Sequence, residues 1–281
     1  MRFSQRLGLS PVKVDVQIDS MDDDLKVALW NAFSGAYVDK YQEKSFSNSK
    51  LRGLFKLIWG DFLKKPLDEF DYFTSVNVSK LKRIYMNYLW YEVYDFIEFV
   101  SKTQLPDVMD SEVFMGLCNF NLEKELSAYR FVGGQIVQIT DEQEIVEIEG
   151  AINNEEIISG VKIHLSRALQ LLSDRKTPDY RNSIKESISA VESIAQVITG
   201  DSKASLGNAL KTIDEKVGIH KALVKGLSSI YGYTSDEAGI RHAMQEEKDI
   251  HFEDAKYMLV SCSAFINYLF MKSIRAGISL K

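Results

Sequence analysis

The sequence predicts a mainly α protein with a helical N-terminal domain, one small β-hairpin near residues 129–140 and a C-terminal helical bundle. Apolar side chains recur every three or four residues along most of the chain, which is the period of helices buried on one face. Only residues 129–140 group β-forming side chains around a Gly-Gly pair. The 281 residues are 45% hydrophobic and 26% charged, with four prolines. This is an ordinary composition for a protein with a sizeable core.

A first helix is expected to start near residue 21. Three carboxylates, Asp22, Asp23 and Asp24, precede Leu25 and a series of apolar positions at helical spacing. Acidic side chains favour the positive end of a helix dipole and provide N-cap acceptors. We favour this interpretation over a Mg²⁺ site formed by the three acids.

Two further helices are expected in residues 51–62 and 78–101. The first ends before Pro66, because proline interrupts a helix. The second is rich in aromatic positions and also carries three basic residues, Lys80, Lys82 and Arg83. At this spacing the aromatic rings are expected to form a buried helix face. The alternative is a nucleic-acid surface on which the rings stack against bases beside the three cations.

The net charge of −6 hides a gradient along the chain. Residues 40–83 carry ten Lys/Arg against five Asp/Glu, whereas residues 84–150 carry three against thirteen. Such neighbouring blocks indicate either a nucleic-acid face or two complementary surfaces within one domain. The second interpretation requires no partner.

The β-forming segment also marks the expected domain boundary. Asp141, followed by Glu144, is typical of a helix cap, and the helical pattern resumes there. We therefore predict an N-terminal domain of residues 1–140 and a C-terminal domain of residues 141–281. No low-complexity tract lies between them, which argues against a long flexible linker.

The second half is expected to contain helices that pack as a bundle. Their approximate ranges are residues 154–174, 178–199, 204–216, 219–231 and 252–275. Pro178 opens the second of these helices and Gly200 closes it, in agreement with the usual preferences at helix ends. Each of the two longest helices has one continuous apolar face, so we expect these faces to meet.

The first residues, the longest apolar run and the cysteines of the chain all favour an intracellular protein. The first residues contain no apolar core typical of a secretion signal. The longest apolar run, residues 257–270, is short for a bilayer span and contains polar breaks. We expect a cytoplasmic protein without membrane contact. Cys118 and Cys262 lack metal-ligand spacing, which favours reduced core thiols over a zinc site.

Acid–base residues concentrate just before the last apolar helix. The segment contains four candidate catalytic residues: Arg241, His242, Glu246 and His251. Arginine binds phosphate through two hydrogen bonds and histidine transfers protons near neutral pH, so the set suits RNA cleavage or phosphate binding. The alternative is structural: Arg241 pairs with nearby acids, and His242 forms a hydrogen bond near a helix end.

Polar residues at the start of the 178–199 helix pose a similar choice. Arg181 and Asn182 either cap and brace this helix or complete a polar cleft in the bundle. Glu186 and Glu192 would face that cleft, although their spacing matches one helix face imperfectly. No role is assigned to the other two histidines, His164 and His220.

Both halves of the chain resemble known families. In the second half the resemblance rests on YRNSIKESISAVE at residues 180–192, SLG at 205–207, YGYTSDE at 231–237 and GIRHA at 239–243. This half resembles the HEPN-like domain that ends many abortive-infection proteins. In the first half, FSQR at 3–6, IDSMDD at 18–23 and LWN at 29–31 resemble the N-terminal domain of AbiJ-type phage-resistance proteins. The two resemblances cover nearly the whole chain.

The HEPN resemblance implies a bacterial antiviral protein, and many HEPN proteins are metal-independent endoribonucleases that act as dimers. Their usual motif is an arginine, a polar residue and a histidine after four to six intervening positions. Arg241 fits the arginine and His242 fits the polar residue. The positions permitted for the histidine hold other residues, Glu246, Glu247 and Lys248. His251 follows only after nine intervening residues.

Two classes of function remain open. In the first, a toxin-like ribonuclease is restrained by its N-terminal domain until a phage-derived trigger releases it. Arg241 then stabilises the phosphorane charge, His242 or His251 acts as base toward a ribose 2′-hydroxyl, and Glu246 orients that imidazole. In the second, the C-terminal bundle dimerises or binds a partner, and residues 40–83 sense a phage protein or nucleic acid. We expect a homodimer, with no metal and no cofactor.

Overall fold

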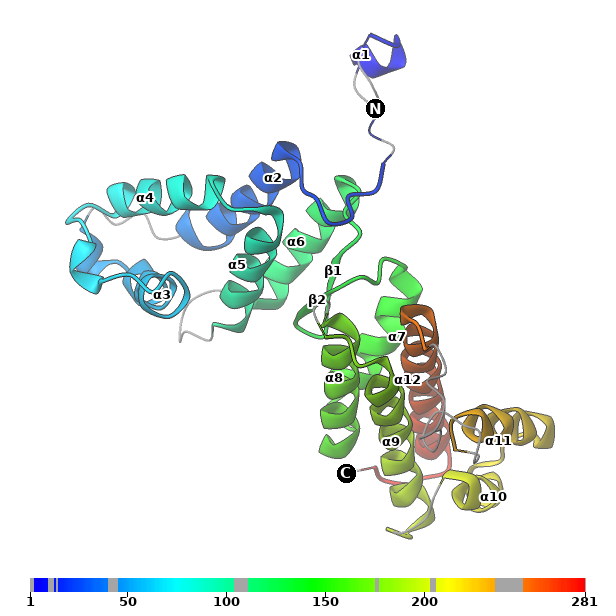
Figure 1. Cartoon of the computed structure of the whole chain (residues 1–281). Helices are drawn as coiled ribbons and strands as arrows, with labels where there is room; N and C mark the ends of the chain where they lie inside the picture. The colour runs from blue at the N-terminus through cyan, green and yellow to red at the C-terminus, as the bar shows by residue number, and fades with distance from the viewer. Residues whose placement is uncertain are drawn as a thin grey trace. The chain divides into compact units, whose positions relative to one another are not determined.

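The computed structural model describes residues 3–9, 13, 15–39, 45–103, 111–174, 177–202, 206–235 and 250–280. Over these residues the chain is mainly helical, with one antiparallel two-stranded hairpin, which confirms the predicted fold class. The chain divides into two compact units, Met1–Thr140 and Asp141–Lys281, whose elements are labelled in Figure 1. We refer to them as unit 1 and unit 2.

Unit 1 combines helices with a small hairpin. Its described α-helices and strands are α1 (Phe3–Arg6), α2 (Asp23–Phe33), α3 (Leu51–Leu57), α4 (Thr74–Met86), α5 (Trp90–Lys102), α6 (Ser111–Lys124), β1 (Arg130–Val132) and β2 (Gln135–Val137). Two helices continue with a wider, π-helical pitch, α2 through Ser34–Val38 and α3 through Ile58–Phe62. The helix predicted over residues 51–62 is therefore α3 with its π-helical extension, and it ends before Pro66.

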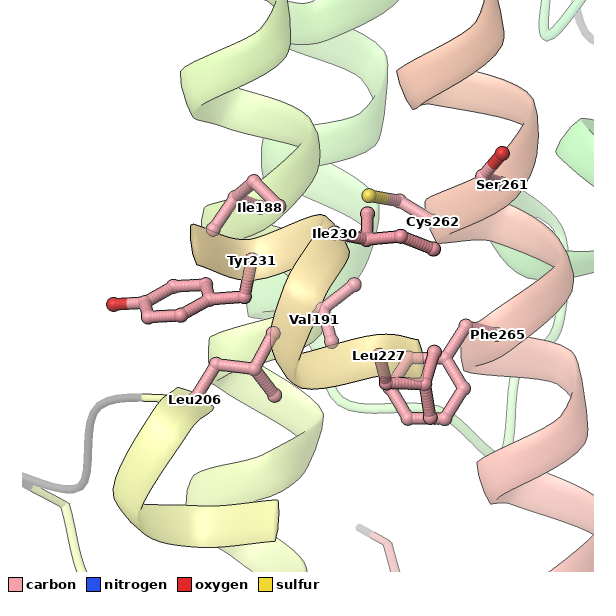
Figure 2. A pocket seen from close by; sticks show the side chains of 9 residues that line it. All are labelled: Ile188, Val191, Leu206, Leu227, Ile230, Tyr231, Ser261, Cys262 and Phe265. Atoms are coloured by element: carbon pink, nitrogen blue, oxygen red, sulfur yellow. The ribbon is translucent and has the colours of Figure 1, made fainter. Parts of the chain in front are cut away.

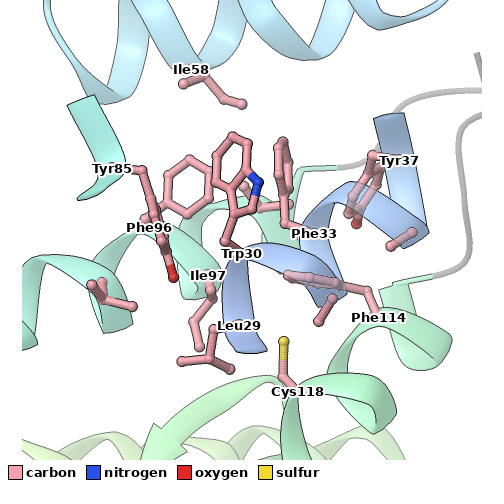
Figure 3. Close-up of a cluster of buried hydrophobic side chains, with 14 of the residues drawn as sticks. Leu29, Trp30, Phe33, Tyr37, Ile58, Tyr85, Phe96, Ile97, Phe114 and Cys118 are labelled. Carbon is pink, nitrogen blue, oxygen red and sulfur yellow. The ribbon is translucent and has the colours of Figure 1, made fainter. Parts of the chain in front are cut away.

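Aromatic side chains from α2, α4, α5 and α6 form much of the core of unit 1 (Figure 3). The Trp30 and Tyr85 rings lie 5.2 Å apart, and Phe33 meets Phe96 edge to face at the same distance. Such pairs bury large apolar areas and gain additional energy from ring geometry. Phe96 is central to this network, because its ring contacts those of Phe33, Phe62, Tyr85 and Tyr88.

The prediction of one helix over residues 78–101 is wrong, because α4 and α5 are separate helices. Asn87 ends α4, and its side-chain amide donates to a main-chain carbonyl one turn back at 2.7 Å. Leu89 is extended, and its N–H donates to the Glu92 carboxylate at 2.7 Å. Local capping thus satisfies both helix ends. The apolar pattern continues across the break because both helices face one core.

The acids near residue 21 do mark a helix start. Asp22 is the N-cap of α2, and its carboxylate accepts a hydrogen bond from the Leu25 N–H at 2.9 Å. The same carboxylate forms an ion pair with Lys13 at 2.5 Å. Burial opposes ionisation of Asp22. The hydrogen bonds from Lys13 and Leu25 outweigh that effect and lower the pKa of Asp22 from its ordinary 3.8.

Replacing Asp22 by alanine is expected to lower the free energy of unfolding of unit 1 by about 1 kcal/mol, because a first-turn N–H loses its acceptor. The pKa of Asp22 is lower in the fold than in the unfolded chain. Its contribution is therefore present above about pH 4 and is lost as the pH falls through the folded pKa. Urea unfolding at neutral and acidic pH, followed by tryptophan fluorescence, measures this effect.

All three tryptophans of the chain, Trp30, Trp59 and Trp90, belong to unit 1, so their fluorescence reports on this unit. The matched control is Asp24→Ala, which removes an acid from the same turn. Among the described residues, the Asp24 carboxylate accepts no capping hydrogen bond. Equal destabilisation of the two variants at neutral pH would contradict the capping role of Asp22.

The hairpin forms around Gly133 and Gly134, as predicted. Both glycines have positive φ, 54° and 79°, which is the combination that a two-residue type I′ turn requires. The side-chain amide of Asn119 in α6 donates to the Phe131 carbonyl at 2.9 Å and accepts the Phe131 N–H at 2.7 Å. The three residues of β1 are buried, so the hairpin is part of the unit 1 core.

Unit 2 is a bundle of helices. Its described elements are α7 (Glu142–Ile152), α8 (Ser159–Ser173), α9 (Tyr180–Thr199), α10 (Leu206–Val217), α11 (Lys221–Ser235) and α12 (Phe252–Arg275). The central helix is α9, which packs against α8, α10 and α12 (Figure 1). Asp141 caps α7 by accepting two backbone N–H groups, and Gly200 ends α9 with φ 76°. Both helix ends agree with the prediction.

The last helix, α12, has apolar side chains on two faces. Among the described helices it is the one that is long and apolar enough, by composition, to cross a membrane. Within unit 2 its buried face packs on α9 and α7 and includes Met258, Leu259, Cys262, Ile266 and Leu269. Its other side exposes Tyr257, Met271 and Ile274 to about half of their full area or more. Packing within unit 2 therefore buries one of the two apolar faces of α12 and leaves the other exposed.

Cys118 in unit 1 and Cys262 in unit 2 are buried free thiols, in agreement with the prediction. Burial raises the pKa of both, that of Cys262 to about 12. Both are therefore protonated at neutral pH and are poor nucleophiles.

Candidate functional site

Three of the four candidate catalytic residues lie outside the described residues: Arg241, His242 and Glu246. The fourth, His251, is the N-cap residue of α12, and its backbone N–H donates to the Asp254 carboxylate at 3.0 Å. This acidic first turn suits the positive end of the helix dipole. The His251 residue is exposed.

The starts of α9 and α12 meet beside His251. The rings of Tyr180 and Phe252, the first residues of the two helices, pack edge to face with centroids 6.3 Å apart. Asp179 caps α9 by accepting the Asn182 backbone N–H at 3.0 Å and the Asn182 side-chain amide at 2.7 Å. Asn182 thus braces the helix start, which is the first of its two predicted roles. This end of the bundle is fixed by ring packing and capping.

A histidine–carboxylate pair joins α8 to α9. The Nδ1 atom of His164 lies 2.6 Å from Oε2 of Glu186, and both side chains are partly exposed. The sequence alone indicates no role for His164, and it makes Glu186 a candidate for lining a polar cleft. The two residues are 22 positions apart on different helices. The pair forms because of how α8 and α9 pack against each other, which the spacing of residues in the sequence does not show.

A small apolar cavity lies between α9, α10, α11 and α12 (Figure 2). Its volume is about 30 Å³, whereas sites for small-molecule ligands typically measure about 300–1,000 Å³. The Tyr231 hydroxyl points away from Cys262 in Figure 2 and donates to Glu192 at 3.3 Å. A nucleotide does not fit in this cavity. It is better described as a packing defect beneath α11, and the sequence pattern gave no sign of it.

The three cations predicted for nucleic-acid contact lie on α4 in unit 1. Lys80 donates to the main-chain carbonyl of Glu69 at 3.0 Å, whereas Lys82 and Arg83 are exposed. Tyr85, one turn further, is fully buried in the aromatic core. The cations are therefore accessible, but Tyr85 is not placed to stack on a base.

The first half of the chain decides its family. The family model described as AbiJ N-terminal domain 4 matches residues 1–154, which is more than half of the 281 residues. The chain belongs to this family. No curated protein and no solved structure matches the chain.

The match to AbiJ N-terminal domain 4 covers all of unit 1 and continues through α7 of unit 2. It confirms the resemblance of the first half to AbiJ-type proteins, and it includes α4 with its cations. The candidate catalytic residues lie beyond the matched range, in the half whose HEPN-like character remains a prediction. Within the described part of the chain, no group of three or more His, Cys, Asp or Glu side chains is arranged to hold a metal ion.

Proposed function

We propose that this chain is a bacterial abortive-infection protein in which unit 2 cleaves RNA and the AbiJ N-terminal domain restrains cleavage until a phage-derived signal arrives. Membership in the AbiJ N-terminal domain family supports the role in antiviral defence. The resemblance of the second half to HEPN-like domains supports the ribonuclease. The structural observation that favours it most is the exposed His251 at the start of α12, beside the start of α9.

The proposed reaction needs an acid–base group and a positive charge. His242 or His251 removes the proton of a ribose 2′-hydroxyl, and the 2′-oxygen attacks the neighbouring phosphorus. Arg241 stabilises the charge on the phosphorane, and Glu246 orients the imidazole. The bond to the 5′-oxygen then breaks, and that oxygen takes a proton, so the products are a 2′,3′-cyclic phosphate and a 5′-hydroxyl. No metal ion takes part in these steps.

A homodimer is part of this proposal, because the HEPN motif works across two chains. The face of α12 that unit 2 leaves exposed supports it. Tyr257, Met271 and Ile274 would bury apolar area against a second copy. The mass of the protein in solution is therefore measured at the concentration of the cleavage assay. A monomer at that concentration would contradict a site shared between two chains.

Protein isolated from phage-infected cells, in which the proposed restraint is released, is expected to cut total RNA equally well with and without a chelator. The fragments should carry 2′,3′-cyclic phosphate and 5′-hydroxyl ends. Because the N-terminal domain is proposed to restrain cleavage, the same assay with protein from uninfected cells is expected to show weaker cleavage. Intact RNA in both assays at high protein concentration would reject the nuclease, and activity lost in chelator would reject the metal-free mechanism.

The second candidate function is a non-catalytic HEPN-like module that dimerises or binds a partner. The observation favouring it is that the positions permitted for the motif histidine hold Glu246, Glu247 and Lys248. In this case the N-terminal domain senses a phage protein or nucleic acid through residues 40–83. Phage protection that survives Arg241→Ala would favour this function over the nuclease.

A further inference from the structure

Two exposed aromatic rings stand together at the start of α4. Tyr72 is 64% exposed and Phe73 is 52% exposed, and their rings meet edge to face with centroids 5.2 Å apart. Rings of this size usually gain stability from burial, so an exposed pair points to a contact with another molecule. Within unit 1 these rings lie outside the aromatic core.

The backbone that carries the two rings is fixed. The Phe46 N–H donates to the Tyr72 carbonyl at 2.8 Å, and Ser45 forms a β-bridge with Phe73. The Phe73 N–H donates to the Asp71 carboxylate at 3.0 Å, and Phe73 is the N-cap residue of α4. The rings are therefore held on an ordered backbone, and little entropy is lost when a flat partner stacks on them.

The exposed residues of α4 that follow the two rings in the sequence carry hydroxyls and then cations. Thr74–Met86 contains three basic residues and no acidic one. Ser75, Ser79 and Lys82 follow one another at helical spacing, and all three are exposed, as is Arg83. Neither Lys82 nor Arg83 has an acidic partner among the described residues. The helix is about 20 Å long at 1.5 Å per residue.

From this arrangement we propose that the outer face of α4 binds single-stranded nucleic acid. Bases stack on Tyr72 and Phe73, and phosphates pair with Lys82 and Arg83. Stacking on aromatic rings beside a cationic track is how single strands are bound without sequence preference. A duplex fits poorly because its base faces are already stacked inside the helix. This proposal rests on the sensing role of the N-terminal domain and specifies nucleic acid as the molecule that it senses. It does not depend on RNA cleavage by unit 2.

The Asp71 carboxylate also affects where the phosphates of the bound strand lie. Asp71 lies next to the rings, and its carboxylate is engaged in capping the Phe73 N–H. Phosphates are repelled by that charge and attracted by the cations in the last turns of α4. The strand therefore stacks its bases on the two rings at the start of the helix and places its phosphates beside the last turns.

The test uses the full-length chain and a fluorescent oligouridine of about 12 nucleotides with 2′-O-methyl groups, followed by anisotropy. This probe lacks the nucleophile for cleavage, so binding can be measured even if unit 2 cleaves RNA. Joint replacement of Tyr72 and Phe73 by alanine is expected to weaken binding at least about tenfold. Joint replacement of Lys82 and Arg83 by alanine should lower the salt dependence, by about 1.4 in the slope of log affinity against log salt.

The matched controls are Phe120→Ala, an equally exposed ring on α6, and Lys124→Ala, an exposed cation on the same helix. Circular dichroism confirms that each variant is folded, and the cation pair provides an independent test if the ring variant is not. Single-stranded DNA and RNA binding alike support the proposal. Absent binding, a duplex bound as tightly as the single strand, or equal losses in the controls would overturn it.

Discussion

Replacing Arg241 by alanine is expected to lower RNA cleavage at least about 100-fold while the unfolding transition stays in place. In the proposed reaction the guanidinium faces charge that develops only in the transition state. Removing one such donor typically costs about 100-fold to 1,000-fold in rate. Initial rates on a labelled RNA strand measure the loss, and thermal unfolding measures the fold.

Two further variants make the Arg241 result specific. Arg275→Ala removes an exposed arginine from the last turn of α12, and it should leave cleavage unchanged. Arg241→Lys keeps the charge but loses the two-pronged hydrogen bonding, so its activity should be intermediate. A lower melting temperature with unchanged cleavage would show instead that Arg241 is a structural ion-pair partner of its acidic neighbours.

Replacing Phe96 by alanine is expected to destabilise unit 1 by about 3–5 kcal/mol, because the ring is fully buried and its removal leaves a cavity among aromatic neighbours. The free energy of unfolding of a typical domain is only about 5–15 kcal/mol, so the variant should unfold at a much lower urea concentration. Tryptophan fluorescence during urea unfolding gives the free energy. Phe120→Ala, at a ring that is 64% exposed, is the control and should change it by less than about 0.5 kcal/mol.

Local signals made much of the fold predictable. Asp141 acts through its own carboxylate, and Gly200 and the Gly133-Gly134 pair act through their own backbone, so a helix start, a helix end and a turn follow from a few neighbouring residues. The break between α4 and α5 escaped prediction for the opposite reason. The capping residues at this break, Asn87 and Glu92, give only a weak signal in the sequence, because they lie within an apolar pattern that continues across them.

The candidate functional side chains were less accessible to prediction, because their surroundings depend on contacts between distant segments. The pairing of His164 with Glu186 requires the register of two packed helices, which spacing along one helix does not contain. The exposure of Tyr72 and Phe73 depends on the path of the chain into α4, where these residues pair with the segment at residues 45–46. The resemblance of the first half to AbiJ-type proteins succeeded because its segments lie within the matched domain.

The placement of the two cysteines gives the chain a separate reporter in each unit. Cys118 is buried in unit 1 and Cys262 in unit 2, and no other cysteine is present in the sequence. A thiol reagent reaches either one only when its surroundings open. Alkylation followed by peptide mass spectrometry would therefore time the opening of each unit separately in one unmodified protein. Release of the second unit by a phage signal, with the first still closed, would be read directly as labelling of Cys262 alone.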